Sequence, residues 1–317
     1  MFTDLKSRLY GTFHTVYTPF LMDYSIDYES LSTYLHGLYH RGARIFYAMA
    51  YNSRYGLLSD SEILALNEFT ITTLKRIDPN NLVVVGDPIM GSTQNSVHFA
   101  EAAKSSGADM ISLLLQEKFF TESQVLDHLA EVGRQTGMPI MVHEMPFFSG
   151  YTGEQIDWPV NLFDGLKSIP QVVALKEDSK KPELTKAALS LEPDIRIVIA
   201  GTKANLLQFL PYGARAYLNG ISSIDAEIGS VFWEAAQAGE DRLVSRIIKE
   251  VEDPFFKGVV AKYGWHRCNK AILQAAGIMH RRDRMPMQHL SETEFSEVAT
   301  VYQEIIESWS RILEERA

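Results

Sequence analysis

The sequence contains a single cysteine, Cys268, in a chain of 317 residues. One cysteine cannot form an intrachain disulfide, so no such cross-link is expected to support the fold. No apolar run approaches the ~18 residues that a membrane-spanning helix needs, which excludes an integral membrane protein. The segment from Met1 to Lys6 lacks the apolar stretch of a signal peptide. We therefore expect a cytoplasmic protein with no membrane partner.

Positive charge is scarce, with 30 Lys and Arg residues against 40 Asp and Glu residues and a net charge of -10. Nucleic acids and anionic membrane surfaces both require a concentrated positive face. The charge balance therefore argues against these partners and favours a small-molecule partner. An apolar share of 46% is ample for a sizeable core.

Several motifs of cofactor-binding proteins are also missing. Gly86 and Gly91 are not followed by the Lys-Ser or Lys-Thr of a phosphate loop, and the chain has no dinucleotide fingerprint. His143 and Glu144 begin like a metalloprotease motif, but the second histidine is absent and no cluster of Cys and His occurs. The sequence thus predicts no metal site.

What the chain does contain is a regular alternation of short β-rich runs and longer amphipathic segments. The predicted strands are Thr12–Tyr17, Arg44–Met49, Leu82–Val85, Met110–Leu114, Ile140–His143, Val172–Leu175, Arg196–Ala200 and Ala216–Asn219. Eight strand–helix units in one chain of this size predict a (β/α)8 TIM barrel, an α/β fold whose active site lies at the carboxyl ends of the strands.

The segment after the eighth strand is longer than one closing helix requires. We expect a barrel core over residues 1–222, and a closing helix with a C-terminal helical extension over residues 223–317. The expected helices are Ser223–Ala238, Asp241–Glu252, Cys268–Ala276 and Glu292–Glu315. An apolar stripe at helical spacing, including Phe295 and Trp309, marks the last one. The stripe packs on the rest of the chain or forms a subunit interface. Tyr263–Arg267 is expected to be a turn between helices.

Lys176 is the most informative residue. It closes the apolar run Val172–Leu175 and precedes Glu177 and Asp178, so an amine lies where a buried strand meets a polar loop. Loss of hydration there favours the free amine, the form that attacks a carbonyl group. The alternative is a lysine that only pairs with a neighbouring carboxylate.

A series of short motifs occurs in a fixed order along the chain. They are Gly11, Val16–Phe20, Ile26–Asp27, Gly86, Ser92–Thr93, Gly107–Asp109, Pro146, Gly150, Pro170–Glu177, Gly201, Gly213 and Arg284–Pro286. In this order and spacing the chain resembles the dihydrodipicolinate synthase and N-acetylneuraminate lyase superfamily of class I aldolases. The resemblance implies a Schiff base between Lys176 and a 2-keto acid such as pyruvate, without an external cofactor. It also implies a homo-oligomer, commonly a tetramer.

One departure from the family lies after the second strand. The family has a Gly-Thr-Thr-Gly-Glu type motif there, which holds the keto acid's carboxylate, whereas this chain has Ala50, Tyr51, Asn52, Ser53 and Arg54. Losing two glycines removes backbone conformations that only glycine adopts at low cost. Asn52, Ser53 and Arg54 are the candidate substrate-binding residues. Arg54 either contacts an anion or is solvated or ion-paired.

A second departure lies after the fifth strand, where the family's proton-relaying tyrosine is replaced by His143. Histidine transfers protons near neutral pH, so the resemblance leaves it a catalytic role, with Tyr51 as the further hydroxyl of the relay. The alternative for His143 is a buried neutral ring bonded to a backbone carbonyl. Glu144 is either a general base that contacts substrate or a structural carboxylate.

The mouth of the predicted barrel is also altered. Phe147 and Phe148 stand where the synthases have an arginine for the second substrate, and an aromatic ring cannot replace its bidentate contact. This argues against the synthase itself. With the loop 116–120, Phe148 suggests an aromatic-lined mouth, unless the rings pack under the loop. Gly201 and Asn219, at the ends of strands seven and eight, are further candidate substrate-binding positions, where some barrels bind phosphate.

The sequence therefore predicts a Schiff-base-forming lyase that acts on a 2-keto acid or a related carbonyl compound. Two alternatives remain. One is a keto-sugar-acid dehydratase that uses the same imine. The other is a catalytically weakened sensor or scaffold, because both accessory motifs are altered.

Overall fold

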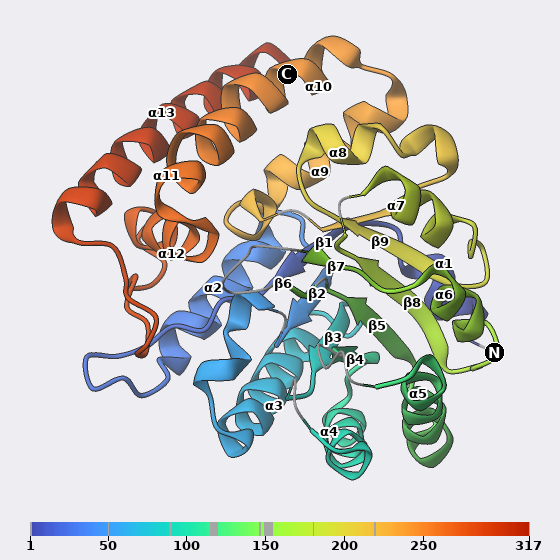
Figure 1. The fold of residues 1–317 in the computed structure, drawn as a ribbon. Coiled ribbons are helices and arrows are strands. Elements are labelled where there is room, and N and C mark those ends of the chain that lie inside the picture. Colours follow the sequence, from blue (N-terminus) through green and yellow to red (C-terminus); the bar gives the residue numbers. More distant parts are fainter. Residues whose placement is uncertain are drawn as a thin grey trace.

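Eight parallel strands form a closed barrel with helices around it, which confirms the predicted (β/α)8 fold (Figure 1). The computed structural model describes residues 2–49, 51–88, 91–114, 120–145, 147–148, 155–179, 181–218 and 220–316, with only the backbone for 147–148 and 155–156. The barrel strands are β1 (Gly11–Thr15), β2 (Ile45–Ala48), β3 (Leu82–Gly86), β4 (Met110–Leu114), β5 (Ile140–Glu144), β8 (Val172–Glu177), β9 (Arg196–Ala200) and β10 (Ala216–Leu218). Their order around the barrel is β1-β10-β9-β8-β5-β4-β3-β2. A separate antiparallel pair is formed by β6 (Phe147–Phe148) and β7 (Gln155–Ile156).

Apart from α1, which precedes β1, the helices follow strands and cover the outside of the barrel. The α-helices in this part of the chain are α1 (Thr3–Arg8), α2 (Tyr28–His40), α3 (Asp60–Ile77), α4 (Thr93–Ser106), α5 (Glu122–Thr136), α6 (Val160–Leu166), α7 (Pro182–Leu189), α8 (Lys203–Leu207) and α9 (Ala226–Ala238). Short 3-10 turns are η1 (Tyr51–Ser53), η2 (Tyr55–Leu57), η3 (Leu210–Tyr212) and η4 (Ile221–Ser223).

Local sequence explains where several of these helices begin. Ser59 caps α3 and exchanges hydrogen bonds with Glu62, and Thr121 does the same with Gln124 at the start of α5. Such capping boxes satisfy backbone N–H groups that have no partner within the helix. Gly107, with φ 93°, ends α4 in the left-handed conformation that glycine adopts without strain.

Alternate strand positions face the barrel interior and the helices. Phe13, Tyr47 and Val84 belong to an apolar cluster that contains no residue of the surrounding helices, so they face inward. Val83 and Leu175 belong to a cluster with many helix residues, so they face outward. This alternation follows from the period of two in a strand, and it decides which polar side chains point into the barrel.

The amino-terminal helix closes one end of the barrel. Phe2 and Leu5 pack against the interior apolar cluster, and Leu9 is fully buried in it. The polar residues of the site therefore lie toward the opposite end, where the strands finish.

The sequence-based strand boundaries differ from the structure by a few residues. The shift that matters for the site concerns β8, which extends to Glu177 rather than ending at Leu175. Lys176 is consequently part of the strand, where it pairs in register with His143 on β5 and Val198 on β9. Ladder pairing on both sides continues the strand past the end of the apolar run.

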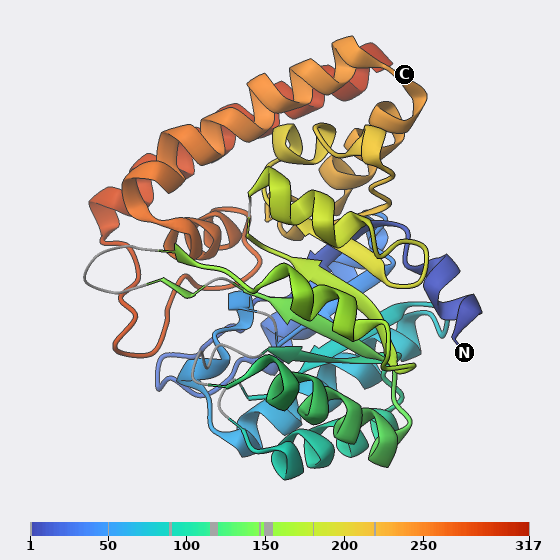
Figure 2. The ribbon, with the colours of Figure 1, turned by 45° about the vertical axis from the view of Figure 1, so that its right-hand side comes forward.

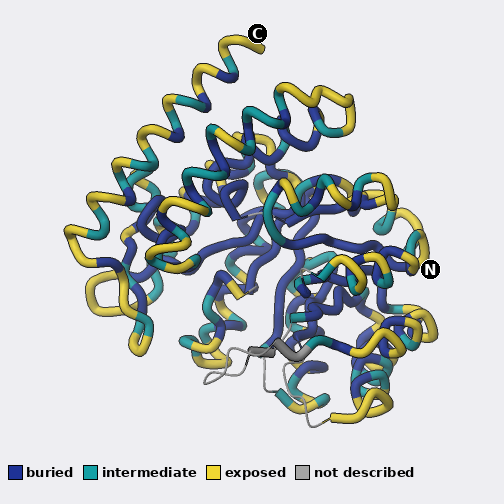
Figure 3. Tube along the Cα trace, turned by 45° about the horizontal axis from the view of Figure 1, so that its top comes forward, coloured by how far each residue is buried: buried dark blue, intermediate teal, exposed yellow. Residues whose placement is uncertain are grey.

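After α9 the chain forms the C-terminal helical extension. Its elements are α10 (Asp241–Arg246), the π-helical segments η5 (Ile247–Glu252) and η6 (Pro254–Val260), α11 (Ala261–Tyr263), α12 (Trp265–Ala275) and α13 (Glu292–Arg316). The long α13 packs along η5, η6 and α12 (Figure 2). One face of α13 is buried and the other is exposed (Figure 3). The boundary between residues 222 and 223 remains a prediction.

The apolar stripe of α13 is used within the chain. Val298, Ile305, Trp309 and Ile312 are buried, and Phe295 packs on the same core. The packing interpretation of the stripe is therefore the one that the structure supports.

Candidate active site

Lys176 lies inside the barrel near the end of β8. Leu175 faces the helices, and the Glu177 carboxylate accepts a hydrogen bond from Thr185 on α7, so the residue between them faces inward. Lys176 is 4% exposed. Its amine is thus held among interior side chains near the carboxyl ends of the strands.

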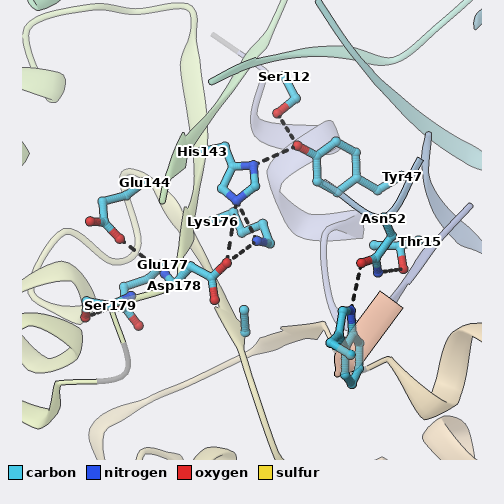
Figure 4. A network of polar contacts seen from close by, with 12 residues as sticks. Thr15, Tyr47, Asn52, Ser112, His143, Glu144, Lys176, Glu177, Asp178 and Ser179 are labelled. Carbon is cyan, nitrogen blue, oxygen red and sulfur yellow. Dashed lines mark hydrogen bonds and ion pairs between the residues drawn. The ribbon is translucent and has the colours of Figure 1, made fainter. Parts of the chain in front are cut away.

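Two groups of different chemistry contact this amine (Figure 4). Lys176 Nζ lies 2.6 Å from His143 Nε2 and donates a hydrogen bond of 2.9 Å to Asp178 Oδ2. The histidine nitrogen and the carboxylate oxygen are themselves 3.7 Å apart. An amine, an imidazole and a carboxylate therefore meet at one point.

His143 has a second contact, on the other side of its ring. Its Nδ1 lies 3.2 Å from the Tyr47 hydroxyl, which lies 2.7 Å from Ser112 Oγ. All three side chains are buried, and burial raises the pKa of the Tyr47 phenol. The sequence analysis missed Tyr47 and Ser112, whereas the pairing of Lys176 with a neighbouring carboxylate, which it gave as an alternative, is present in the contact with Asp178. Tyr47 and Ser112 lie within apolar strand runs, where only the inward register signals a polar role.

Two outward-facing carboxylates support the loop that carries Asp178. Glu144 Oε2 accepts a hydrogen bond of 3.3 Å from the Asp178 backbone N–H. Glu177 accepts from the Ser179 backbone N–H at 2.8 Å and from the Thr185 hydroxyl at 2.9 Å. Burial raises the pKa of Glu177. The hydrogen bond from the Asp178 backbone favours the interpretation of Glu144 as a structural carboxylate. A direct contact of Glu144 with substrate stays a prediction.

The segment that replaces the family's carboxylate motif is tied to other parts of the chain. Asn52 donates from Nδ2 to Thr15 Oγ1 at 2.8 Å and accepts at Oδ1 from Trp265 Nε1 at 2.9 Å. Ser53 Oγ donates to the Val16 carbonyl at 2.6 Å. Both side chains are buried and already hold protein groups, so their role toward a substrate stays a prediction.

Arg54 adopts the left-handed backbone region, with φ 56°. Its guanidinium carbon lies 4.3 Å from the centre of the Tyr51 ring. Tyr51 is 41% exposed. The two side chains line a pocket of about 250 Å³ together with Tyr55, Gly56, Leu57, Pro286 and Met287. The phenol that lies against His143 is that of Tyr47. A role of Tyr51 together with His143 stays a prediction.

Trp265 is a residue of this region that the sequence analysis assigned to a turn. Gly264, with φ 86°, is indeed the turn between α11 and α12, but Trp265 begins α12 and reaches Asn52 near the end of the barrel. Its ring stacks on Phe256 with centroids 5.3 Å apart. The helical extension therefore contributes a side chain to the surroundings of the site.

The remaining predicted residues fall partly outside the described residues. Gly201 follows β9 with φ 133°, and its carbonyl accepts from the Tyr217 hydroxyl at 3.2 Å. Asn219 lies outside the described residues, as do Ala50 and residues 115–119, and of Phe148 only the backbone is described. The binding roles of Gly201, Asn219 and Phe148 stay predictions.

Two classes of feature are absent from the described part of the chain. No group of three or more His, Cys, Asp or Glu side chains that could hold a metal ion occurs among these residues. None of the helices in the same part is long and apolar enough to cross a membrane.

The fold and the site together define an aldolase-type (β/α)8 barrel with an interior lysine. The chain belongs to the dihydrodipicolinate synthetase family, whose model matches residues 8–305. The predicted family is thereby confirmed.

Among proteins of known sequence, a 4-hydroxy-tetrahydrodipicolinate synthase from Psychrobacter sp. (strain PRwf-1) is 22% identical over 294 residues, which are 92% of this chain and 93% of that protein. The 4-hydroxy-tetrahydrodipicolinate synthase of Bacillus subtilis (strain 168) is 26% identical over 209 residues, 65% of this chain and 69% of its own.

Solved structures of other proteins share the fold. The 4-hydroxy-tetrahydrodipicolinate synthase of Methylacidiphilum fumariolicum SolV matches with a TM-score of 0.83 at 18% identity, covering 96% of this chain and 98% of that chain. N-acetylneuraminate lyase from Fusobacterium nucleatum matches with a TM-score of 0.81 at 17% identity, covering 94% and 99%. The chain thus combines the fold of these enzymes with a distant sequence.

Proposed function

We propose that this chain is a Schiff-base-forming lyase in which Lys176 forms an imine with a 2-keto acid or a related carbonyl compound. The observation that carries the proposal is the contact of Lys176 Nζ with both His143 Nε2 and Asp178 Oδ2 inside the barrel. A lysine with an adjacent acid–base group is the arrangement that covalent catalysis by an amine requires. The imine itself would serve as the electron sink, without an external cofactor.

Imine formation needs proton transfers at two steps. The neutral amine attacks the carbonyl carbon, and the resulting carbinolamine loses water when its hydroxyl group is protonated. His143, 2.6 Å from Nζ, would take the proton from the amine and return it to the leaving hydroxyl. Asp178 would stabilise the cationic states of both neighbours.

The protonated imine then accepts the electron pair released in the next step. In an aldol cleavage, the bond between the α and β carbons breaks, a base removes the proton of the β hydroxyl, and an enamine and an aldehyde result. In a dehydration, a base removes an α proton and the β hydroxyl leaves as water. His143 and Asp178 would supply two acid–base groups for either route, so dehydration is the second candidate.

We expect a substrate different from that of the synthases. The chain has Phe147 and Phe148 where the resemblance assigns the synthases residues that include an arginine, and Arg54 lines a pocket together with Tyr51 and Tyr55. A small-molecule substrate, a homo-oligomer such as a tetramer, and a cytoplasmic location remain predictions.

Borohydride trapping tests the imine directly. We would add borohydride to the protein with pyruvate, and then with a panel of other 2-keto acids and of aldehydes, and locate adducts by peptide mass spectrometry. We expect an adduct at Lys176 that is absent from Lys176→Ala. Analysis of the products formed from the compound that reacts would then distinguish aldol cleavage from dehydration, because cleavage releases an aldehyde and dehydration does not.

Lys270 provides a matched internal control. It is fully buried, burial lowers its pKa to about 8, and its amine donates to the Thr18 carbonyl at 2.7 Å. This buried amine should remain unlabelled if position inside the barrel decides reactivity. Failure of every carbonyl compound to label the folded protein would favour the scaffold alternative over the lyase.

A further inference from the structure

Trp265, from the helical extension, lies along one side of the barrel mouth. Its Nε1 donates to Asn52, which follows β2, at 2.9 Å. The loop at Gly220, which follows β10, lies so close to the ring that an added Cβ would overlap Cη2. Since β2 and β10 are the two neighbours of β1 in the barrel, the indole meets the loops on both sides of β1. It is therefore at the end of the barrel that carries Lys176.

Small residues lie between the indole and the amine of Lys176. In the barrel, β9 is the single strand that separates β8 from β10. Val198 of β9 faces inward, so Ala200, two positions later and paired with Leu218 of β10, faces inward too. At its carboxyl end β9 thus presents a methyl group, followed by the bare backbone of Gly201. A compound joined to Lys176 has room to extend in the direction of Trp265.

The indole is held rigidly and its one donor is already used. Phe256 stacks on the ring with centroids 5.3 Å apart and planes at 20°, and Phe255 meets it edge-on at 5.7 Å. Indole has a single N–H and no acceptor, and Asn52 receives that hydrogen bond. Trp265 is nevertheless only half-buried. What it presents to a ligand is apolar ring surface without a free hydrogen-bonding group.

We propose that Trp265 is a specificity-determining residue, which selects carbonyl substrates whose group beyond the carbonyl is planar and apolar, such as an aromatic 2-keto acid. The inference rests on the proposed function, which places the carbonyl carbon at Lys176. The remainder of the compound extends past Ala200 and Gly201, and its planar group packs against the accessible surface of the indole.

The chemistry of the ring distinguishes two kinds of substrate chain. A planar apolar group gains buried area and a favourable ring-on-ring geometry against Trp265. A polyhydroxylated chain would lose hydrogen bonds to water there and find no partner on an indole whose N–H is taken, which costs free energy. The contacts of Trp265 therefore favour an aromatic keto acid over a keto-sugar acid.

Calorimetric binding tests the inference without the imine. 3-Phenyllactate and lactate have the carbon skeletons of phenylpyruvate and pyruvate, but they carry a hydroxyl in place of the keto group and form no imine. We expect Trp265→Ala to weaken binding of 3-phenyllactate about tenfold and to change that of lactate little. Unchanged or tighter binding of 3-phenyllactate by Trp265→Ala would overturn the inference. So would a wild-type protein that does not bind 3-phenyllactate.

Further variants separate the ring from other effects. Trp265→Phe keeps an aromatic ring but cannot donate to Asn52, so it should retain most of the affinity for 3-phenyllactate. A loss as large as that in Trp265→Ala would assign the effect to Asn52 and contradict the inference. Trp265→Leu removes the planar ring with a smaller loss of apolar volume, and it serves if Trp265→Ala does not fold. Trp309→Phe changes a buried indole of α13 and should leave both affinities unchanged.

Borohydride trapping connects this selectivity to Lys176. Wild type should form the adduct with phenylpyruvate faster than with 2-ketogluconate, whose chain is polyhydroxylated, and Trp265→Ala should lower the ratio of the phenylpyruvate rate to the pyruvate rate about tenfold. Adducts at Lys176 whose rate ratio ignores Trp265→Ala would contradict the inference and leave the proposed function intact. A folded protein without any adduct would contradict the proposed function, while the calorimetric comparison still decides the role of Trp265.

Discussion

At the scale of single residues, the surroundings of Lys176 combine an imidazole that can take a proton with a carboxylate that can hold the amine in place. His143 supplies the first and Asp178 the second, at 2.6 and 2.9 Å from the amine. Charge-assisted hydrogen bonds of this kind also fix geometry, because the carboxylate orients the amine toward the imidazole. Glu144 and Glu177 in turn hold the backbone around Asp178.

Asp87, after β3, is a buried carboxyl with a different effect. Burial raises the pKa of Asp87 to about 7, despite hydrogen bonds from Ser96 and from backbone amides. Among the residues that the structure describes, Asp87 Oδ1 has no hydrogen-bond partner of ordinary geometry. The folded chain thus retains a proton that the unfolded chain, with a carboxyl pKa near 3.8, has lost. The free energy of unfolding therefore has its full value below about pH 4 and falls as the pH rises through about 7.

We therefore expect Asp87→Asn to raise the free energy of unfolding at pH 8 by about 2–4 kcal/mol and to change it little at pH 4. Urea unfolding of both proteins at the two pH values checks this. Asp4→Asn is the control, since the Asp4 side chain is 88% exposed and should leave the pH dependence unchanged. The same pH dependence in Asp87→Asn as in wild type would contradict a protonated buried carboxyl.

How far the sequence predicts the site depends on the residue. Lys176 and His143 follow from local pattern and from the family resemblance, because each ends a recognisable strand. Tyr47 and Ser112 do not, since a polar residue in an apolar strand reveals its role only when the barrel closes and brings β2, β4 and β5 together. Trp265 is harder still, because its contact with Asn52 joins residues 213 positions apart.

At the scale of elements, the start of α12 and the loop after β10 fit closely together. A Cβ built on Gly220 would lie 1.7 Å from Trp265 Cη2 and 1.9 Å from Cζ2. The φ of Gly220 is -70°, which any residue adopts, so the need for glycine is steric and not conformational. Trp265 can reach Asn52 because the loop at Gly220 presents bare backbone to its ring.

Gly220→Ala should accordingly lower the free energy of unfolding by about 1–3 kcal/mol or more, because the added methyl group overpacks the space that the Trp265 ring occupies. The same substitution made in a Trp265→Ala background should cost less than about 1 kcal/mol, since the ring that it meets is gone. Urea unfolding of the four proteins gives the coupling energy.

Gly37→Ala supplies the matched control for this cycle. Gly37 lies within α2, and an added Cβ would meet no atom within 4 Å. Alanine there should stabilise the chain by about 0.5–1 kcal/mol. Equal costs of Gly220→Ala with and without the Trp265 ring would show that the steric explanation is wrong.

Element boundaries show the physical limit of sequence patterns. Met110–Leu114 and Arg196–Ala200 were predicted with the bounds that β4 and β9 have, because apolar runs mark both. The polar end of β8 was not, since Lys176 and Glu177 remain in the strand through pairing with β5 and β9. The π-helical segment η5 lies within the predicted helix Asp241–Glu252, whereas η6 was not predicted; both segments contact α13.

At the scale of the whole molecule, the helical extension and the barrel are joined by buried and half-buried polar contacts. Lys270 donates to the Thr18 carbonyl at 2.7 Å, and Trp265 to Asn52 at 2.9 Å. Arg284 forms an ion pair of 2.6 Å with Glu62 on α3. These contacts reach loops after β1 and β2 and one barrel helix, so opening of the extension would also remove support from the end of the barrel that carries Lys176.

We expect the extension and the barrel to unfold together, and Ile305→Ala tests this. Ile305 is 1% exposed on the buried face of α13, and its truncation should cost about 2–5 kcal/mol. Hydrogen exchange measured by mass spectrometry would follow peptides of α13 and β8 separately. In a cooperative chain, the slowest amides of both elements lose protection by the same free energy. Glu304→Ala, at the exposed neighbouring position, should change neither. Loss of protection confined to α13 would instead identify the extension as a separately unfolding unit.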